Sequence, residues 1–173
     1  MLENGLLVIV DKPLKSQFYS LLGDSYNSLK KYQDSDLAFK KALEIDSNNA
    51  VVLNNYAYYV SEREEKSAQN NSLEKAKRMS KKSLELEPSS STFADTYAWI
   101  LFKMQDYKNA KIWIKKSIEL GGDKSSVIIE HYGDILIMLG EVDLALEQWN
   151  KAKIMGGASE FIDKKIQDKA YHE

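Results

Sequence analysis

The stretch STFADTYAWILFKMQDYKNAKIWIKKSIELGG (residues 91–122) contains the pattern that decides the fold. Counted from its first residue, the small residues Ala98, Ala110 and Ser117 stand at the eighth, twentieth and twenty-seventh places, and the larger Tyr97 stands at the seventh. Small side chains at these places let two antiparallel helices approach each other closely, and the large one fills the gap between them. The stretch therefore predicts a helix pair, made of a first helix, a turn and a second helix.

Four units of about 34 residues share this pattern, with an insertion in the second unit. They begin at Ser16, Ala50, Ser91 and Ser126. Their matching residues are Leu22, Tyr56, Tyr97 and Tyr132 at the seventh place, Gly23, Ala57, Ala98 and Gly133 at the eighth, Ser35, Ala76, Ala110 and Ala145 at the twentieth, and Ala42, Ser83, Ser117 and Ala152 at the twenty-seventh. The pattern resembles the tetratricopeptide repeat, and the resemblance covers nearly the whole chain.

The resemblance implies an all-α fold, namely a right-handed superhelix of stacked antiparallel helix pairs, or α-solenoid. Neighbouring pairs in such an array bury one continuous apolar seam instead of a single globular centre. The chain has 173 residues, of which 43% are hydrophobic, and this is enough to bury a sizeable core. Only two prolines and eight glycines interrupt the helices.

The spacing predicts one repeat array over residues 1–173, divided into four repeats and two end segments. The repeats are expected at residues 16–49, 50–90, 91–125 and 126–159. The extra length of the second repeat falls near residues 63–72, in a polar and charged stretch. Insertions in such arrays map to loops on one face, so we expect either a mobile loop here or a first helix that continues through residues 61–66.

Residues 1–15 are expected to form the second helix of a truncated preceding repeat, with Pro13 at the place where Pro88 closes the second repeat. The chain would then be the C-terminal part of a longer, bacterial array; a short N-terminal cap is the alternative. Residues 160–173 are expected to form a capping helix with one buried face. Gln167 stands at its eighth place, where the repeats have Gly or Ala, and no second helix follows, so we expect a natural C-terminus.

Composition argues against several classes of function. The net charge of −2 argues against a nucleic-acid partner, which is usually bound by a basic surface. The chain has no cysteine, which excludes disulfides and thiolate metal sites, and His131 and His172 lie too far apart in sequence to suggest a histidine metal site. The longest apolar run, residues 6–10, is far below the roughly 20 residues that span a bilayer, and the chain lacks the features of a signal peptide. The sequence does not assign a cellular compartment and slightly favours the cytoplasm.

A concave groove is the expected binding surface, because the first helices line the concave side of proteins similar to this one. Side chains at the second, fifth, ninth and twelfth places of each first helix should point into it. From these places we predict a peptide-binding groove formed by Asp24, Asn27, Asn54, Tyr58, Asp95, Trp99, Phe102, Glu130 and Asp134. Its charges are all acidic, and its aromatic residues supply anchors for an extended peptide. Since a cleft lined by one sign of charge concentrates ligands of the other sign, we expect a basic and hydrophobic peptide.

Several of these residues have a structural alternative. Tyr58 and Trp99 can instead pack against the neighbouring repeat, and Asp95 can hold a backbone group or a tyrosine hydroxyl. Some tetratricopeptide arrays bind the C-terminal carboxylates of chaperones through a clamp of Lys, Arg and Asn. Here Asn54 is of the right type, but the places that would need cations are acidic or uncharged. An acidic peptide tail should therefore be repelled.

Glu130 and Asp134 lie four residues apart, so their carboxylates share one face of a helix and can carry out acid–base chemistry or hold a cation. However, His131 points about 100° away from Glu130 on a helix. No nucleophile, phosphate-binding or zinc motif is present in the sequence. We therefore expect no enzymatic activity, no cofactor and no metal site.

The leading hypothesis is a non-catalytic scaffold for protein–protein interaction that binds a peptide in its concave groove. The alternative is a structural segment that self-associates, or completes a longer array, through an N-terminal apolar edge at residues 2–10. A third hypothesis is an RNA-binding repeat protein of the pentatricopeptide kind. Such a protein needs a basic groove, and the acidic residues count against it.

Overall fold

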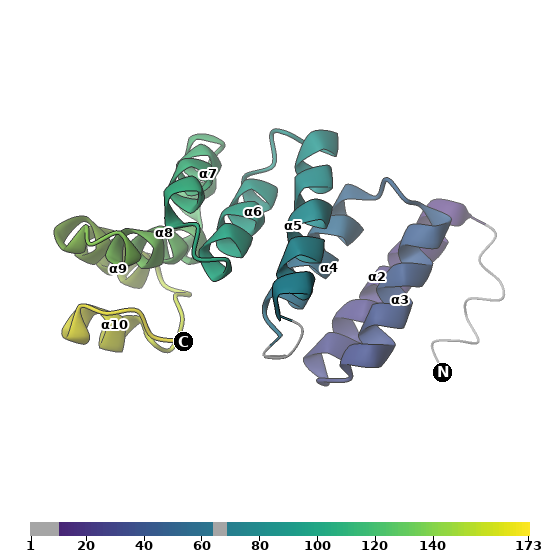
Figure 1. The fold of residues 1–173 in the computed structure, drawn as a ribbon, viewed down its shortest axis with the longest axis horizontal. Helices are drawn as coiled ribbons and strands as arrows, with labels where there is room; N and C mark the ends of the chain where they lie inside the picture. Colours follow the sequence, from purple (N-terminus) through teal and green to yellow (C-terminus); the bar gives the residue numbers. More distant parts are fainter. Residues whose placement is uncertain (1–10, 64–68) are drawn as a thin grey trace. The chain divides into compact units, whose positions relative to one another are not determined.

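The computed structural model describes residues 11–63 and 69–173, and every regular element within these ranges is helical (Figure 1). It has nine α-helices and one short 3-10 helix in the described residues, without a strand among them. The all-α prediction is therefore confirmed. Within the same ranges, no helix is both long enough and apolar enough to cross a membrane. The chain divides into two compact units, residues 1–86 and residues 87–173.

The N-terminal unit consists of two helix pairs. Its helices are α2 (Lys12–Ser28), α3 (Tyr32–Ile45), α4 (Ala50–Ser61) and α5 (Gln69–Leu86). α2 packs against α3 and α4 packs against α5, and α4 also contacts both helices of the preceding pair. The first two predicted repeats therefore correspond to two stacked helix pairs.

The C-terminal unit repeats this arrangement and adds one short helix. Its elements are α6 (Ser91–Lys103), α7 (Tyr107–Glu119), η1 (Gly122–Lys124), α8 (Ser126–Met138), α9 (Val142–Met155) and α10 (Ile162–Asp168). α6 pairs with α7 and α8 pairs with α9, while α7 contacts α8 and α10 packs on α9. The C-terminal unit therefore consists of two helix pairs and a short helix packed on the second of them.

Side-chain caps explain why three of the first helices begin where they do. Asn49, Ser90 and Ser125 each precede a helix directly, and their side-chain oxygens accept a hydrogen bond from the backbone N–H three residues later, at 3.1, 3.3 and 3.4 Å respectively. Such a cap satisfies one of the N–H groups that have no partner inside the helix. The start of each of these repeats is therefore encoded locally.

The predicted small-residue places are buried in all four pairs. At two of them a glycine is required, because a Cβ on Gly23 would lie 2.7 Å from Phe39 Cε2 and a Cβ on Gly133 would lie 2.4 Å from Trp149 Cδ1. In the other two pairs, where the eighth place is alanine, the residue equivalent to Phe39 and Trp149 is a serine or an isoleucine. The size of this side chain on the second helix is therefore matched to the space that the eighth-place residue of the first helix leaves.

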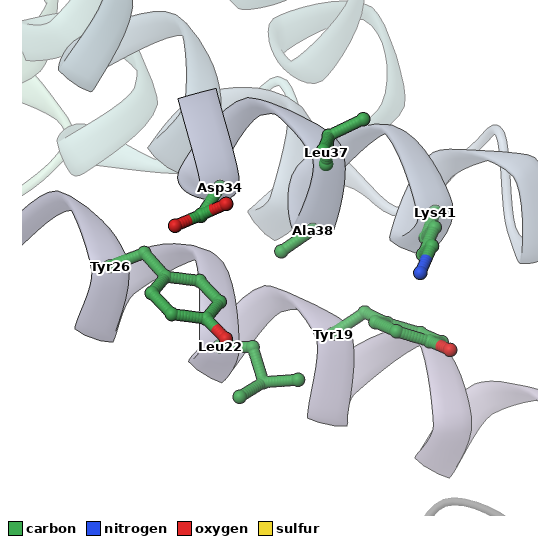
Figure 2. A pocket seen from close by; sticks show the side chains of 7 residues that line it. All are labelled: Tyr19, Leu22, Tyr26, Asp34, Leu37, Ala38 and Lys41. Atoms are coloured by element: carbon green, nitrogen blue, oxygen red, sulfur yellow. The ribbon is translucent and has the colours of Figure 1, made fainter. Parts of the chain in front are cut away.

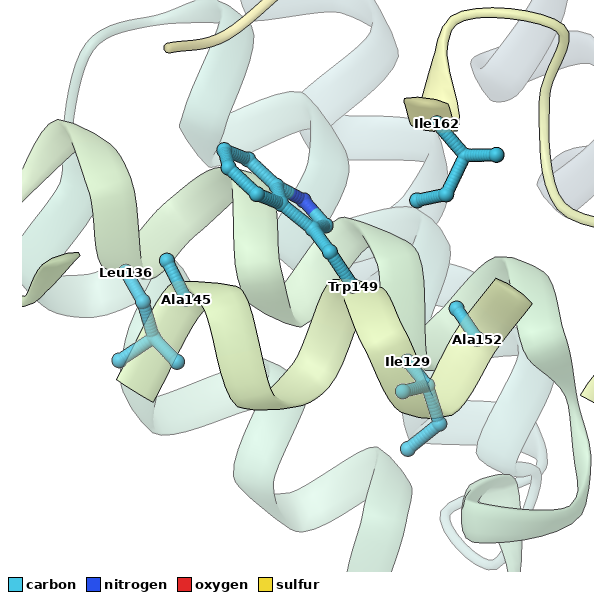
Figure 3. Close-up of a cluster of buried hydrophobic side chains, with 6 residues drawn as sticks. All are labelled: Ile129, Leu136, Ala145, Trp149, Ala152 and Ile162. Carbon is cyan, nitrogen blue, oxygen red and sulfur yellow. The ribbon is translucent and has the colours of Figure 1, made fainter. Parts of the chain in front are cut away.

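The core of the last pair shows this packing directly (Figure 3). Trp149 of α9 is fully buried and lies between the helices of its own pair and α10. The surrounding buried residues are Ile129 and Leu136 of α8, Ala145 and Ala152 of α9, and Ile162 of α10. A single apolar cluster thus joins α8, α9 and α10.

Three boundaries differ from the prediction. α2 begins at Lys12, four residues before the expected start, because Pro13 lies in the first turn of this helix, where its missing N–H costs nothing. α4 ends at Ser61 and does not continue through the insertion, whereas the helix after it already begins at Gln69. α10 ends at Asp168, because Lys169 adopts a left-handed conformation with φ 52°. Residues 1–10 of the helix expected over residues 1–15, and residues 64–68 of the loop expected near residues 63–72, lie outside the described residues.

Ala110 provides a test of the repeat frame, because its side chain is completely buried in the C-terminal unit. Replacing Ala110 with Leu should lower the free energy of unfolding by about 1–3 kcal/mol, since the added atoms must be forced into a close-packed interface. Urea denaturation followed by tryptophan fluorescence measures the effect in this unit, which contains all three tryptophans. Lys108→Leu, on the exposed side of the same helix, is the matched control. Equal stability of the two variants would contradict the frame.

Candidate functional site

Glu130 and Asp134 of α8, here called the acidic pair, bind one ammonium group together. Lys165 of α10 places Nζ 2.7 Å from Glu130 Oε1 and 2.8 Å from Asp134 Oδ2. All three side chains are nearly inaccessible, with 5%, 5% and 1% of Lys165, Glu130 and Asp134 exposed. A carboxylate pair can carry out acid–base chemistry or hold a cation. The structure shows the second use, and the cation is the ammonium group of the chain's own Lys165.

The remaining oxygens of the acidic pair also accept hydrogen bonds. Glu130 accepts from the backbone N–H of Ser159 at 2.7 Å and from its hydroxyl at 2.5 Å. Asp134 accepts from the indole N–H of Trp149 at 2.9 Å. Burial acts to raise the pKa of Glu130, but hydrogen bonds from Lys165 and Ser159 outweigh it and hold this pKa below its usual value. At Asp134 burial dominates and raises the pKa, although Lys165 opposes it.

The residues after α10 lie on α6. The ring of Tyr171 meets the ring of Phe102 edge-on, with 5.1 Å between centroids. The carboxylate of Glu173 lies 2.6 Å from Lys103 Nζ and also accepts a hydrogen bond from the Tyr171 hydroxyl. Residues 159–173, here called the C-terminal segment, therefore contact both first helices of their unit.

Asp95 and Trp99 of α6 are covered by α8. Asp95 Oδ1 lies 2.9 Å from His131 Nδ1, and the imidazole ring stacks on Trp99 with 4.0 Å between centroids. Trp99 also stacks on Phe102 of its own helix at 4.7 Å. For Trp99 the structure thus shows the alternative given by the sequence, packing against the neighbouring repeat.

These contacts follow one register along the chain. The residue at the sixth place of a first helix contacts the fifth or ninth place of the first helix before it, with α10 counted as the next first helix. The contacts join Asn55 to Asp24, His131 to Asp95 and Trp99, and Lys165 to Glu130 and Asp134. Four of the five predicted groove residues of the C-terminal unit therefore contact the next first helix; they are Asp95, Trp99, Glu130 and Asp134.

The N-terminal unit differs, because buried acceptors there lack donors. No described residue donates a hydrogen bond to Asp24 Oδ1, Asn27 Oδ1 or Asn54 Oδ1, although each atom is buried. The carboxyl group of Asp24 is hydrogen-bonded to Tyr59 and Asn55; burial nevertheless raises its pKa. An acceptor left without a donor costs about 1–3 kcal/mol. A ligand that supplies N–H groups would remove this cost.

The structure thus separates the nine predicted groove residues into two sets. Asp24, Asn27 and Tyr58 are half-buried and Asn54 is buried in the N-terminal unit. The other five are buried in the C-terminal unit and do not line an open groove in this structure; they are Asp95, Trp99, Phe102, Glu130 and Asp134. Sequence reasoning missed Lys165 and Ser159. The signal for Lys165 was a charge on the face of α10 that also carries Ile162 and Ile166.

A shallow pocket between α2 and α3, here called the edge pocket, is the second candidate site (Figure 2). It is lined by Tyr19, Leu22, Tyr26, Asp34, Leu37, Ala38 and Lys41. Tyr19 and Tyr26 stand at the fourth and eleventh places and are only partly buried. Residues at the same places on α4 and α8 are buried; they are Leu53, Val60, Ile129 and Leu136. The edge pocket thus leaves partly open two places that are buried in the second and fourth pairs.

Comparison with known proteins identifies the kind of repeat. A family model described as tetratricopeptide repeat matches residues 11–156. No curated protein matches the sequence. Among solved structures, PilW, described as a widely conserved type IV pilus biogenesis factor, has a TM-score of 0.79 at 15% identity, covering 97% of this chain and 74% of that protein.

Two further structures have the same fold. PilF of Pseudomonas aeruginosa has a TM-score of 0.68 at 20% identity and covers 90% of this chain and 71% of its own. The first tetratricopeptide domain of Spaghetti (RPAP3), bound to the HSP90 peptide SRMEEVD, has a TM-score of 0.58 at 13% identity, covering 72% of this chain and 92% of that domain. At these identities the likeness shows the fold alone.

The buried ion cluster predicts a large effect of one substitution. Lys165→Met should lower the free energy of unfolding of the C-terminal unit by about 3–5 kcal/mol, because it leaves two carboxylates buried without their cation. Lys164→Met, one residue away and exposed, should change it by about 0.5 kcal/mol or less. Urea denaturation followed by tryptophan fluorescence compares them, and similar losses in both would contradict the assigned ion cluster.

The loss caused by Lys165→Met should shrink as the pH is lowered from 7 to 4. Without the ammonium group, burial raises the pKa of both carboxyls in the folded chain, so protonation restores stability at low pH and the deficit grows as the pH rises. Denaturation of the wild type and the variant at several pH values measures the difference. A deficit independent of pH would indicate a loss of packing alone.

Proposed function

The chain belongs to the tetratricopeptide repeat family, and we propose that it is a non-catalytic scaffold that binds a protein or peptide segment along its first helices. Membership of a family of protein-interaction repeats supports binding in general. The polar face of the N-terminal unit supports a particular place, since Asp24, Asn27, Asn54 and Tyr58 stand on α2 and α4 at the places predicted for the groove. In the C-terminal unit the equivalent places are already occupied by the chain.

The buried acceptors of the N-terminal unit carry this proposal. Asp24, Asn27 and Asn54 each have an oxygen that lacks a donor among the described residues. Oxygen atoms accept hydrogen bonds and attract positive charge, so they suit backbone N–H groups or a Lys or Arg side chain. Tyr58 adds an aromatic surface beside Tyr59, with 5.8 Å between ring centroids. A basic and hydrophobic segment therefore fits these four residues.

An acidic ligand does not fit the same residues. The RPAP3 domain is bound to the peptide SRMEEVD, in which two glutamates and an aspartate stand together. In this chain, Asp24 would repel the carboxylates of such a sequence, and none of the four residues carries a positive charge to bind them. We therefore place the ligand of this chain in a different chemical class from that peptide.

A displayed peptide library tests this assignment. Peptides that combine Lys or Arg with an aromatic or aliphatic residue should be enriched, and a selected peptide should bind the double variant Asn27→Leu, Asn54→Leu at least tenfold more weakly, as measured by fluorescence anisotropy. The double variant should remain folded, because it removes buried acceptors that have no donor. Gln33→Leu, at an exposed position of α3, is the control. Enrichment of acidic peptides, or unchanged binding by the double variant, would contradict the proposal.

The edge pocket favours a second function, assembly through the N-terminal face of α2 and α3. Exposed large apolar side chains of α2 and α3 include Leu14, Leu21 and Leu37, of which Leu37 lines the pocket. The equivalent places of the second and fourth pairs are buried, so a helix of a second copy or of another protein would bury these places in the first pair as well. This observation supports the alternative in which the chain is a structural segment.

Sedimentation velocity at increasing concentrations tests self-association through this face. In that case the wild type should form larger species as concentration rises, and Leu37→Lys should shift the transition to higher concentration. Ile112→Lys is a closely matched control, because Leu37 and Ile112 stand at the same place of their repeats and are 57% and 63% exposed. A wild type that stays monomeric at all concentrations would exclude self-association through the edge pocket.

A further inference from the structure

The C-terminal segment lies on the face of α6 and α8 that the sequence assigns to ligand binding. Lys165 enters between the carboxylates of the acidic pair, and Ser159 donates two hydrogen bonds to Glu130. Further along, Tyr171 contacts Phe102 and Glu173 pairs with Lys103. A segment at the end of the described chain therefore provides the cation and the aromatic group predicted for a bound peptide.

The segment also has the physical properties of a ligand that folds when it binds. α10 has only seven residues, and an isolated helix of this length is not stable in water. It is joined to α9 through Gly156 and Gly157, both at positive φ. A Cβ on Gly156 would meet nothing within 4 Å, whereas a Cβ on Gly157 would lie 3.2 Å from Ser126 Oγ, so the connection is not packed in at its first glycine. The order of the segment thus depends on its contacts with the unit.

We infer that the C-terminal segment is a detachable intramolecular ligand. The surface beneath it binds a segment that carries a lysine and, six positions later, an aromatic residue, as Lys165 and Tyr171 are spaced here. The lysine lies between Glu130 and Asp134, and the aromatic ring lies against Phe102. This inference deepens the proposed function and rests on it in one respect, the assignment of binding to the first helices. It adds two statements to the proposed function: the chemical class of the ligand, and the condition that the C-terminal segment must dissociate before that ligand can bind.

The covalent connection explains why a competing segment would bind the intact chain weakly. A short flexible linker holds its ligand at an effective concentration on the order of millimolar, so an external segment must compete against that value. Cutting the linker removes this advantage without removing any contact. The cut chain should then exchange its C-terminal segment for one supplied in solution.

A full-length chain with a protease site inserted between Gly156 and Gly157 makes this measurable. After cleavage, a fluorescent peptide of residues 158–173 should replace the native segment, as followed by anisotropy. The cut chain should bind it at least tenfold more tightly than the uncut chain does. A peptide carrying Lys165→Met should compete at least tenfold more weakly than the native peptide. A peptide carrying Lys164→Met should compete equally, because Lys164 is exposed.

Three results would overturn the inference. The first is unfolding of the C-terminal unit on cleavage, seen in its tryptophan fluorescence, which would make the segment an integral structural part. The second is a cut chain that stays folded but never exchanges the peptide. The third is equal competition by the Lys165→Met and Lys164→Met peptides, which would show that the acidic pair does not select a lysine.

The assay also separates this inference from the proposed function. The Asn27→Leu, Asn54→Leu variant should bind the 158–173 peptide normally after cleavage, because both substitutions lie in the N-terminal unit. If this variant no longer binds the library peptide but still exchanges the 158–173 peptide, both assignments are supported. If the cut chain exchanges the 158–173 peptide but the library yields no ligand, the inference stands and the proposed site in the N-terminal unit is ruled out.

Discussion

Close contact between the paired helices is the constraint on which the rest of this structure depends. The contact fixes the register of each pair, because only small side chains fit where the backbones approach. Its strictest form is at the eighth place, where glycine faces Phe39 or Trp149 and a single added carbon would lie within 3 Å of the ring. Where Ser80 or Ile114 stands opposite, the eighth place is alanine. The volumes of two positions sixteen or more residues apart are therefore coupled.

A fixed register also decides which polar side chains meet between successive first helices. A side chain at the sixth place contacts the fifth or ninth place of the first helix before it, and its chemical type matches the groups at those places. Asn55 and His131 each meet one carboxylate, that of Asp24 and of Asp95 respectively, whereas Lys165 meets two. A neutral amide or an imidazole suffices in the first two cases, but two buried carboxylates require a full positive charge. The polar contacts between first helices thus follow the same register as the core.

The sequence predicted the helix pairs because small-residue spacing is local and repeats four times. It missed the start of α2, because a proline such as Pro13 is compatible with the first turn of a helix as well as with a turn before it. The groove prediction considered each first helix alone. Coverage by the C-terminal segment joins residues between 29 and 70 positions apart across a Gly-Gly turn, and the repeat pattern contains no information about it. The one local sign was Lys165 on an otherwise apolar stripe.

The use of lysine at this position has a physical consequence beyond stability. Apolar residues at positions 130, 134 and 165 together would extend the cluster around Trp149 and avoid the cost of burying three charges. However, release of such an apolar cap would leave only an apolar surface, which any hydrophobic segment could cover. Release of Lys165 leaves Glu130 and Asp134, which must be hydrated or meet another ammonium group with its own hydrogen bonds. A buried acidic pair therefore rejects acidic and purely apolar segments alike, and this selectivity is what a reversible binding surface needs.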